Sequence, residues 1–344
     1  MKHLNKLRFA YIFPTNLEHP GLAIKYQGQL AAFEKKYNVK AVYFKYNVSD
    51  SFVSKWFKYL YFEFCSVMAI LFSEKVYIRY NPKALITNFC LPFFRFKMIY
   101  LEINAMFDFD LSNLNRYAEK LLHHFFMMYF KWFSAIKYVF VTKEIRQFFI
   151  NKNIKCEDTL FIQNGYYSPC MDDSHCDQAI IEKVKDFSGC FDTVGIFVGG
   201  GYVWHGVSNI IDLAKQHPLV GFIIITFSGY DAVYDNVLSL SFQNVATLNK
   251  VYGYCNFGIS IFGTDISGLT EFSSLKTREY LYNGLPVLTQ AFDCVEYIDV
   301  LKPYVFNIRQ NPDVFDLLLT INDKATISKL ASQRLAWDFL LKDI

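Results

Sequence analysis

The segment EFSSLKTREYLYNGLPV, residues 271–287, combines two carboxylates, a lysine and an Asn-Gly-x-Pro-Val ending. Glu271 and Glu279 lie eight residues apart, and Lys276 stands between them. The second carboxylate is predicted to open a short helix that Gly284 ends, after which the Pro-Val pair begins a buried strand. A carboxylate near a helix start can hold the hydroxyls of a ribose, and the adjoining backbone N–H groups can meet phosphate.

Length and composition predict a protein of two domains with ample cores. The chain has 344 residues, of which 53% are hydrophobic and 19% aromatic, and a domain takes about 150 residues. The uncharged apolar run Phe64 to Phe72 has nine residues, whereas a membrane-spanning helix needs about 20. The first residues run straight into a strand-like segment without a signal-peptide core. These features predict a cytoplasmic protein.

No pattern in the sequence indicates a metal site. The eight cysteines include no Cys-x-x-Cys pair, and they fit idle cytosolic thiols. His123 and His124 are adjacent, so they would point in different directions on a helix and are interpreted as structural. Asp108-Phe-Asp110 is placed in a loop after Asn104, away from a strand end.

Charge is divided unevenly along the chain. The net charge of +3 consists of +11 in residues 1–165 and −8 in residues 166–344, which suggests that the first half meets an anionic surface. Two aromatic, basic segments, 52–62 and 125–133, either pack on the core or anchor the protein in the headgroup zone of an anionic membrane. Nucleic acid is a weaker interpretation, because acidic residues are mixed in.

The order of apolar runs and helical segments predicts two βα series, hence two parallel sheets. The two series are joined by a polar, proline-containing linker at 166–178. Such a chain also fits a two-domain dehydrogenase or a periplasmic binding protein. The expected strands lie at 7–13, 39–44, 76–80, 98–102, 138–142, 193–198, 221–226 and 286–289, with further strand-like pieces near 245–248 and 257–262.

Four segments in order resemble one family. They are the run ending in Gln163-Asn-Gly, the glycine turn FVGGGYVWHGV at 197–207, the segment 271–287, and Arg334-Leu-Ala-Trp337 near the end. The chain resembles glycosyltransferase family 4, whose retaining enzymes have the GT-B architecture. The resemblance implies an α/β fold with two Rossmann-like domains whose parallel sheets face each other across a cleft. Residues 1–165 would bind the acceptor, 166–324 the nucleotide sugar, and 325–344 would form a helix crossing back to the first domain.

The resemblance assigns roles within the opening segment. Glu279 would accept hydrogen bonds from the ribose hydroxyls, and Glu271 would contact hydroxyls of the transferred sugar. Lys276 would compensate the charge that develops on the leaving diphosphate. Arg278 competes for that role, and one of the two cations is expected to be only a surface charge. Ser274 and Leu275 are also placed in the donor site.

The glycine turn departs from the family pattern. Gly200 and Gly201 would let the backbone approach phosphate at a helix N-terminus. His205 occupies the position of the usual lysine, and the turn has no arginine. The glycines do not follow Gly-x-Gly-x-x-Gly with an acidic residue about 20 positions on, which argues against a dinucleotide site.

In the first half, the resemblance places Gly21 in a loop that lines the acceptor and phosphate region, and Asn104 where many members carry histidine. Asn104 could bind a sugar hydroxyl but could not act as a base. Arg79 would lie near the acceptor or serve the structure. Retaining enzymes of this type are thought to use front-face displacement, in which the leaving phosphate helps to deprotonate the acceptor. The resemblance implies neither a metal nor a resident cofactor.

The sequence therefore predicts a retaining glycosyltransferase that moves a sugar from a UDP- or GDP-linked donor to a saccharide acceptor. The acceptor is expected to be lipid-linked, as in capsule, O-antigen or exopolysaccharide synthesis, at the inner face of the cell membrane. One alternative is a catalytically weak or inactive relative that binds a glycan or a partner protein. Another is a different Rossmann-type enzyme with a nucleotide cofactor. No nucleic-acid partner is expected.

Overall fold

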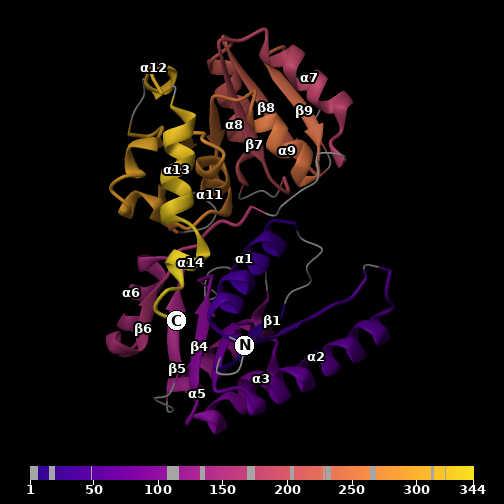
Figure 1. Cartoon of the computed structure of the whole chain (residues 1–344), viewed down its shortest axis with the longest axis vertical. Helices are drawn as coiled ribbons and strands as arrows, with labels where there is room; N and C mark the ends of the chain where they lie inside the picture. Colours follow the sequence, from indigo (N-terminus) through magenta and orange to yellow (C-terminus); the bar gives the residue numbers. More distant parts are fainter. Residues whose placement is uncertain are drawn as a thin grey trace, which may run out of the picture. The chain divides into compact units, whose positions relative to one another are not determined.

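The chain folds into two compact α/β units (Figure 1). The N-terminal unit comprises residues 1–163 and 340–344, and the C-terminal unit comprises residues 164–339. The computed structural model describes residues 7–14, 20–47, 49–106, 116–131, 136–168, 175–201, 205–227, 229, 234–263, 269–310, 314–321 and 323–344.

The described strands of the N-terminal unit form one parallel sheet in the order β2-β1-β3-β4-β5-β6. Its strands are β1 (Arg8–Phe13), β2 (Asn38–Tyr43), β3 (Lys75–Arg79), β4 (Met98–Ile103), β5 (Ile136–Phe140) and β6 (Thr159–Phe161). Its helices are α1 (Pro20–Lys36), α2 (Phe52–Phe72), α3 (Leu85–Cys90), α5 (Tyr117–Lys131) and α6 (Lys143–Asn151), with 3₁₀ turns η1 (Leu91–Phe94) and η2 (Cys156–Asp158).

The core of this unit is largely aromatic. Phe9 and Phe33 lie with ring centroids 4.5 Å apart, and the Tyr11 and Tyr77 rings meet edge to face with centroids 6.0 Å apart. Stacked and tilted ring pairs of this kind add about 0.5–1.5 kcal/mol each to the burial of their area. The high aromatic content of the sequence is therefore used in part to pack α1 against β1 and β3.

The C-terminal unit contains a second parallel sheet, in the order β14-β12-β10-β7-β8-β9. Its strands are β7 (Thr193–Val198), β8 (Val220–Thr226), β9 (Val237–Ser241), β10 (Phe257–Ile259), β12 (Val287–Thr289) and β14 (Val305–Asn307), and β11 (Glu271–Phe272) pairs with β13 (Phe292–Asp293). Its helices are α7 (Gln178–Ser188), α8 (Val207–Gln216), α9 (Val245–Tyr252), α11 (Leu275–Tyr282), α12 (Val314–Leu319) and α13 (Lys324–Arg334), with 3₁₀ turns η5 (Cys294–Tyr297) and η6 (Lys302–Tyr304).

Alternate residues of the central strands enter two separate cores. Ile196 of β7 and Ile223 of β8 pack in one cluster, while Phe197 and Phe222 pack in the other. Side chains of a strand point alternately to opposite faces, so a strand buried on both faces reads as a continuous apolar run. This explains why these strands could be predicted from the sequence.

The prediction of an α/β chain with two parallel sheets is confirmed. The strand-like piece expected near 245–248 is wrong, because these residues begin helix α9. The predicted helix at 325–344 is wrong in one respect, because it is interrupted between α13 and the short α14 (Trp337–Leu340). At the interruption the Tyr166 N–H donates to the Leu335 carbonyl at 2.9 Å. Beyond α14, the Lys36 ammonium donates to the Leu341 carbonyl at 2.8 Å, within the N-terminal unit.

Candidate functional site

The winding of the C-terminal sheet reverses between β7 and β10. From β7 the chain passes to β8 and β9 on one side, and β10, β12 and β14 lie on the other side. In open α/β sheets, ligands bind outside the carboxyl ends of the strands at such a switch point. The glycine turn Gly199–Gly201 follows β7 at this point, and Ser260–Gly263 follow β10.

Helix α11 begins one turn earlier than expected. Leu275 is its first residue and Glu279 its fifth, so the prediction that Glu279 opens the helix is wrong. Ser274 is the N-cap residue, with extended backbone, and its N–H donates to the Asp293 carboxylate at 3.3 Å. The Ser260 hydroxyl donates to Ser274 Oγ at 3.1 Å, which ties the cap to the end of β10. The N–H groups at the helix start therefore belong to Leu275 and its neighbours.

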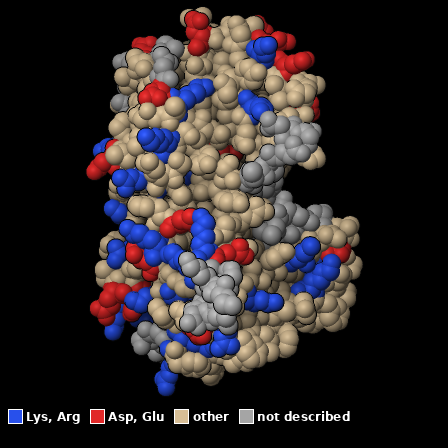
Figure 2. Space-filling model, in the orientation of Figure 1, with Lys and Arg blue, Asp and Glu red and all other residues tan. Residues whose placement is uncertain are grey.

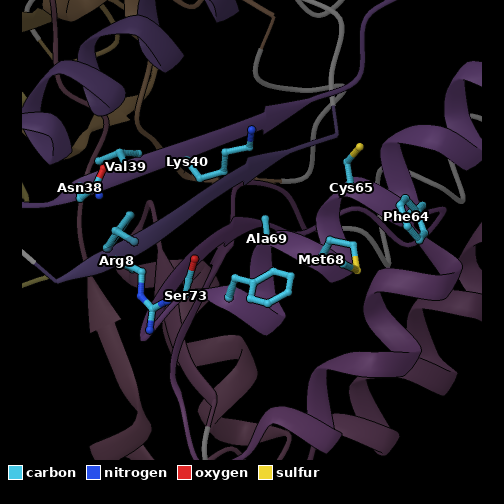
Figure 3. Close-up of a pocket in the computed structure, with 11 residues that line it drawn as sticks. Arg8, Asn38, Val39, Lys40, Phe64, Cys65, Met68, Ala69 and Ser73 are labelled. Carbon is cyan, nitrogen blue, oxygen red and sulfur yellow. The ribbon is translucent and has the colours of Figure 1, made fainter.

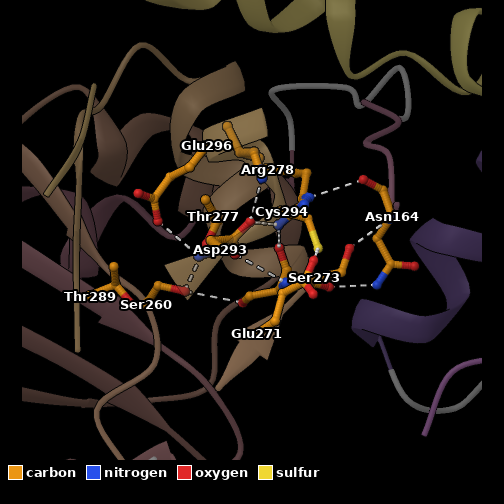
Figure 4. Close-up of polar contacts among 12 residues, drawn as sticks. Asn164, Ser260, Glu271, Ser273, Thr277, Arg278, Thr289, Asp293, Cys294 and Glu296 are labelled. Carbon is orange, nitrogen blue, oxygen red and sulfur yellow. Dashed lines mark hydrogen bonds and ion pairs between the residues drawn. The ribbon is translucent and has the colours of Figure 1, made fainter. Parts of the chain in front are cut away.

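Arg278 fixes the segment that precedes α11 (Figure 4). Its side chain is fully buried and forms an ion pair with Asp293, while Nε donates to the Asn164 carbonyl at 3.0 Å. The Asn164 N–H in turn donates to Ser273 Oγ at 2.8 Å. The expectation that one of the two cations is a surface charge is wrong, because Arg278 is a buried structural group and the Lys276 side chain is half-buried.

Lys276 reaches the glycine turn. Its ammonium lies 5.0 Å from the centroid of the Phe197 ring, and no hydrogen bond joins it to another residue that the structure describes. Burial lowers the pKa of Lys276 to about 8, while the charge of Glu279 acts to raise it. A bound anion beside Lys276 would give the ammonium the opposite charge and the hydrogen-bond acceptors that the described residues do not provide.

Glu279 is oriented by a buried tyrosine. The Tyr252 hydroxyl, from the end of α9, donates to Glu279 Oε1 at 2.8 Å. Burial raises the pKa of Glu279, and the hydrogen bond from Tyr252 and the charge of Lys276 oppose that rise. The bond engages one carboxylate oxygen and restricts the orientation of the side chain. The sequence analysis missed Tyr252, which lies 27 residues before Glu279 and belongs to no motif.

The glycine turn leaves room for Lys276 and His205. A Cβ atom on Gly199 would lie 2.9 Å from Lys276 Cε and 3.1 Å from His205 Nδ1, so both side chains lie against this glycine. Gly201 adopts φ = +72°, which favours glycine, and the half-buried Gly200 precedes it. The structure thus brings Lys276, Glu279, His205 and the turn to one end of the sheet.

Glu271 has a different environment. Its side chain is buried on β11, and Oε1 accepts a hydrogen bond from Cys294 Sγ at 3.0 Å. Burial raises the pKa of the Cys294 thiol, with the charge of Asp293 adding to the effect. The predicted contact of Glu271 with the transferred sugar stays a prediction.

In the N-terminal unit, Glu102 is the centre of a buried polar network that includes Asn104. Glu102 accepts from the Lys25 ammonium at 2.8 Å and from the Gln29 amide at 2.7 Å. Although burial acts to raise it, the charges of Lys25 and Arg79 lower the pKa of Glu102 to about 2. Asn104 Oδ1 accepts from Lys25 at 2.7 Å and its amide donates to Glu102. Asn104 is therefore held by its neighbours, and the sequence analysis missed Lys25.

Two other predictions concern the N-terminal unit. Gly21 is the second residue of α1 rather than part of a loop, and no other residue that the structure describes lies within 4 Å of where its Cβ would be. His123 is buried and lies 3.2 Å from the Tyr80 hydroxyl, whereas His124 is exposed. Among the described residues, no group of three or more His, Cys, Asp or Glu side chains could hold a metal ion. The Asp108-Phe-Asp110 segment and Trp204 lie outside the described residues.

Searches against protein-family models and against curated protein sequences find no match. Comparison with solved structures finds HepE from Anabaena in complex with UDP and glucose, with a TM-score of 0.60 and 15% identity over 98% of each chain. It also finds WaaG, a glycosyltransferase involved in lipopolysaccharide biosynthesis, with a TM-score of 0.62 and 13% identity over 97% of this chain and 98% of that one. This chain has the GT-B fold. The trehalose-6-phosphate synthase OtsA is similar too, with a TM-score of 0.61 and 11% identity over 98% and 97%.

Proposed function

We propose that this protein is a glycosyltransferase that moves a sugar from a nucleotide-sugar donor to a saccharide acceptor, with retention of anomeric configuration. The observation that carries the proposal is the pairing of Lys276 and Glu279 on α11, beside the glycine turn at the switch point of the C-terminal sheet. The structures of HepE with UDP and with UDP-glucose support a nucleotide sugar as the donor.

Each group has a physical role in this proposal. The Glu279 carboxylate, held by Tyr252, accepts hydrogen bonds from the ribose hydroxyls. The Lys276 ammonium lies next to the diphosphate, whose negative charge grows when the sugar–phosphate bond breaks. Because partial burial has removed some of the water around the lysine, its attraction to that charge is stronger than at a fully exposed surface. His205 and the N–H groups at the start of α8 would bind the remaining phosphate oxygens.

The experiment is a binding and transfer screen of the full chain with UDP- and GDP-sugars. Saturation-transfer NMR identifies the base and sugar that bind, and product NMR with a neutral and an acidic saccharide acceptor identifies the anomeric configuration. Binding of a nucleotide sugar with transfer supports the proposal. Binding of no nucleotide sugar would remove its basis.

A second candidate is a relative that binds a glycan or a partner protein without catalysis. It is favoured by one observation, that the glycine turn has no arginine and carries His205 in place of a lysine. This candidate predicts donor or glycan binding without hydrolysis or transfer. Measured turnover of the donor would exclude it.

We further propose that the N-terminal unit rests on an anionic membrane, where a lipid-linked acceptor would be presented at the cytoplasmic face. Among the described residues, no helix is long and apolar enough to cross a membrane. Helix α2 exposes large apolar side chains, with Phe52 84% and Tyr61 70% exposed, beside Lys55 and Lys58. Figure 2 shows basic side chains next to a broad uncharged surface in this region. Aromatic rings with flanking lysines suit the headgroup zone.

A cavity beside α2 adds to this surface (Figure 3). It has a volume of about 550 Å³, its walls include Phe64, Met68 and Phe72 of α2, and Arg8 and Lys40 also line it. An apolar hollow edged by cations fits the acyl chain and anionic headgroup of a lipid.

Flotation with liposomes tests the membrane proposal. The double variant Trp56→Ala with Lys58→Gln should lose binding to anionic vesicles while its circular dichroism spectrum stays unchanged. Equal flotation of the double variant and the original protein would contradict the proposal.

A further inference from the structure

A second cavity lies at the switch point of the N-terminal sheet. The order β2-β1-β3-β4 means that the winding reverses between β1 and β3. The cavity of about 240 Å³ is lined by residues at the carboxyl ends of these strands, including Pro14 after β1, Arg79 at the end of β3 and Asn104 after β4. The sheet therefore provides a ligand position here by the same rule that applies to the C-terminal unit.

The Arg79 guanidinium is fixed in place with donors to spare. It donates to the Tyr26 hydroxyl and lies over the Tyr26 ring, 5.4 Å from its centroid. Within the described part of the chain, this is the one hydrogen bond that its side chain makes. A guanidinium carries five N–H donors in a rigid fork that matches the oxygens of a carboxylate or phosphate. Most of these donors are thus left for a ligand in the cavity.

The described charges that line the cavity do not balance. Its cations are Arg79, Lys83 and Arg116, and its one described carboxylate is Glu119. The Glu119 carboxylate forms ion pairs with both Lys83 Nζ, at 3.0 Å, and Arg116 Nε, at 2.8 Å. The adjacent Lys25 ammonium and Glu102 carboxylate form an ion pair at 2.8 Å, so their charges cancel. These groups leave an excess of two positive charges around the cavity.

We infer that this cavity binds an anionic group, a phosphate or a carboxylate, on the saccharide acceptor. The inference rests on the proposed function, because it makes the cavity part of an acceptor site. Arg79 forms paired hydrogen bonds with the anion, and Lys83 and Arg116 contribute the charge that Glu119 does not neutralise. Bidentate bonds between guanidinium and an oxyanion are about twice as strong as neutral hydrogen bonds. A neutral sugar of the same size gains none of this.

The experiment measures binding of three probes to the full chain by calorimetry, with UDP present in excess to occupy the donor site. The probes are glucose 6-phosphate, glucuronic acid and glucose. We expect one or both of the anionic probes to bind at least ten times more tightly than glucose, and which of them does so distinguishes phosphate from carboxylate. Arg79→Gln should weaken the anionic probe roughly 10- to 100-fold, and Arg116→Gln should weaken it several-fold. Arg95→Gln, a change of an exposed arginine that does not line the cavity, should have no effect.

Equal affinity for glucose and both anionic probes would overturn the inference. So would unchanged affinity in a folded Arg79→Gln variant. If that variant does not fold, Arg116→Gln decides, since its side chain is partly exposed, and unchanged affinity there overturns the inference as well. The affinity for UDP is recorded separately. Failure to bind UDP would count against the donor site, whereas preference for glucose over the anions would count against this cavity alone.

Discussion

Replacing Lys276 by methionine should make the protein more stable and at the same time a poorer catalyst. Burial lowers the pKa of Lys276 from 10.5 to about 8, which means that the folded protein disfavours the ammonium form. One pKa unit corresponds to 1.36 kcal/mol, so the cost of keeping this lysine charged at pH 7 is about 3 kcal/mol at most. The side chain is half-buried, and solvent screening reduces the cost to about 1–3 kcal/mol. Methionine has no charge to bury.

The loss of activity follows from the same ammonium. A hydrogen bond to a charged group contributes about 1.5–3 kcal/mol. Because 1.36 kcal/mol is tenfold in rate, the Lys276→Met variant should show a value of kcat/KM lower by roughly 10- to 100-fold. The donor would still be held by Glu279 and the glycine turn, so some activity should remain.

Two assays on the same preparation test whether Lys276→Met gains stability while it loses activity. Urea unfolding at pH 7 should show a higher midpoint for Lys276→Met, and the gain should shrink between pH 8 and 10.5, where the original lysine loses its proton in the folded state before the unfolded one. Steady-state transfer gives kcat/KM. Lys215→Met, which changes an exposed lysine of α8, should alter neither. A Lys276→Met variant that is less stable, or equally active, would refute the reasoning.

Three further outcomes follow from the same contacts. Burial sets the pKa of Lys276 in the free protein at about 8, and the proposal requires its charged form to bind the donor. In a measured pH profile, kcat/KM should therefore fall about tenfold per pH unit above about pH 8, and Lys276→Arg should extend activity to higher pH. Gly199→Ala should lower kcat/KM about tenfold, because its Cβ would lie 2.9 Å from Lys276 Cε and displace that flexible side chain. It should also lower the unfolding free energy, because the same Cβ would lie 2.9 Å from Cζ of the buried Phe197 ring. Gly189→Ala at the end of α7, whose Cβ would meet only backbone oxygens at 3.5 Å, should change neither quantity. Arg278→Met should reduce the unfolding free energy by about 3–5 kcal/mol, because it leaves Asp293 buried without its partner. A loss below about 1 kcal/mol in urea unfolding would contradict the structural role of Arg278.

The fold was largely predictable, because its central strands are apolar on both faces. The strand expected at 193–198 matches β7, and the one at 221–226 lies within β8. Each face of such a strand packs in its own core, so the apolar run is continuous and its ends are clear. The boundaries of α11 were less predictable. The family resemblance places Ser274 in the donor site, whereas the structure shows that it is the N-cap residue and that the helix starts at Leu275.

The candidate site was predictable only where its residues are close in sequence. Lys276 and Glu279 lie three residues apart, and a helix brings them to one side. Contacts between distant segments could not be read from spacing. Tyr252 reaches Glu279 across 27 residues, and Lys25 reaches Glu102 across 77. These long-range pairs set the pKa values and orientations of the site, and the sheet order that creates them becomes visible only in the folded chain.

The most direct test of the donor site is the affinity of Glu279→Gln for UDP, measured by calorimetry beside the original protein. Glutamine keeps the size of the side chain and removes the charge that accepts the ribose hydroxyls. Glu182→Gln, a change of an exposed glutamate on α7, serves as the control. We predict that Glu279→Gln binds UDP roughly 10- to 100-fold more weakly, as expected for the loss of hydrogen bonds to a charged group, while the control binds normally. Equal affinity of Glu279→Gln and the original protein would contradict the account.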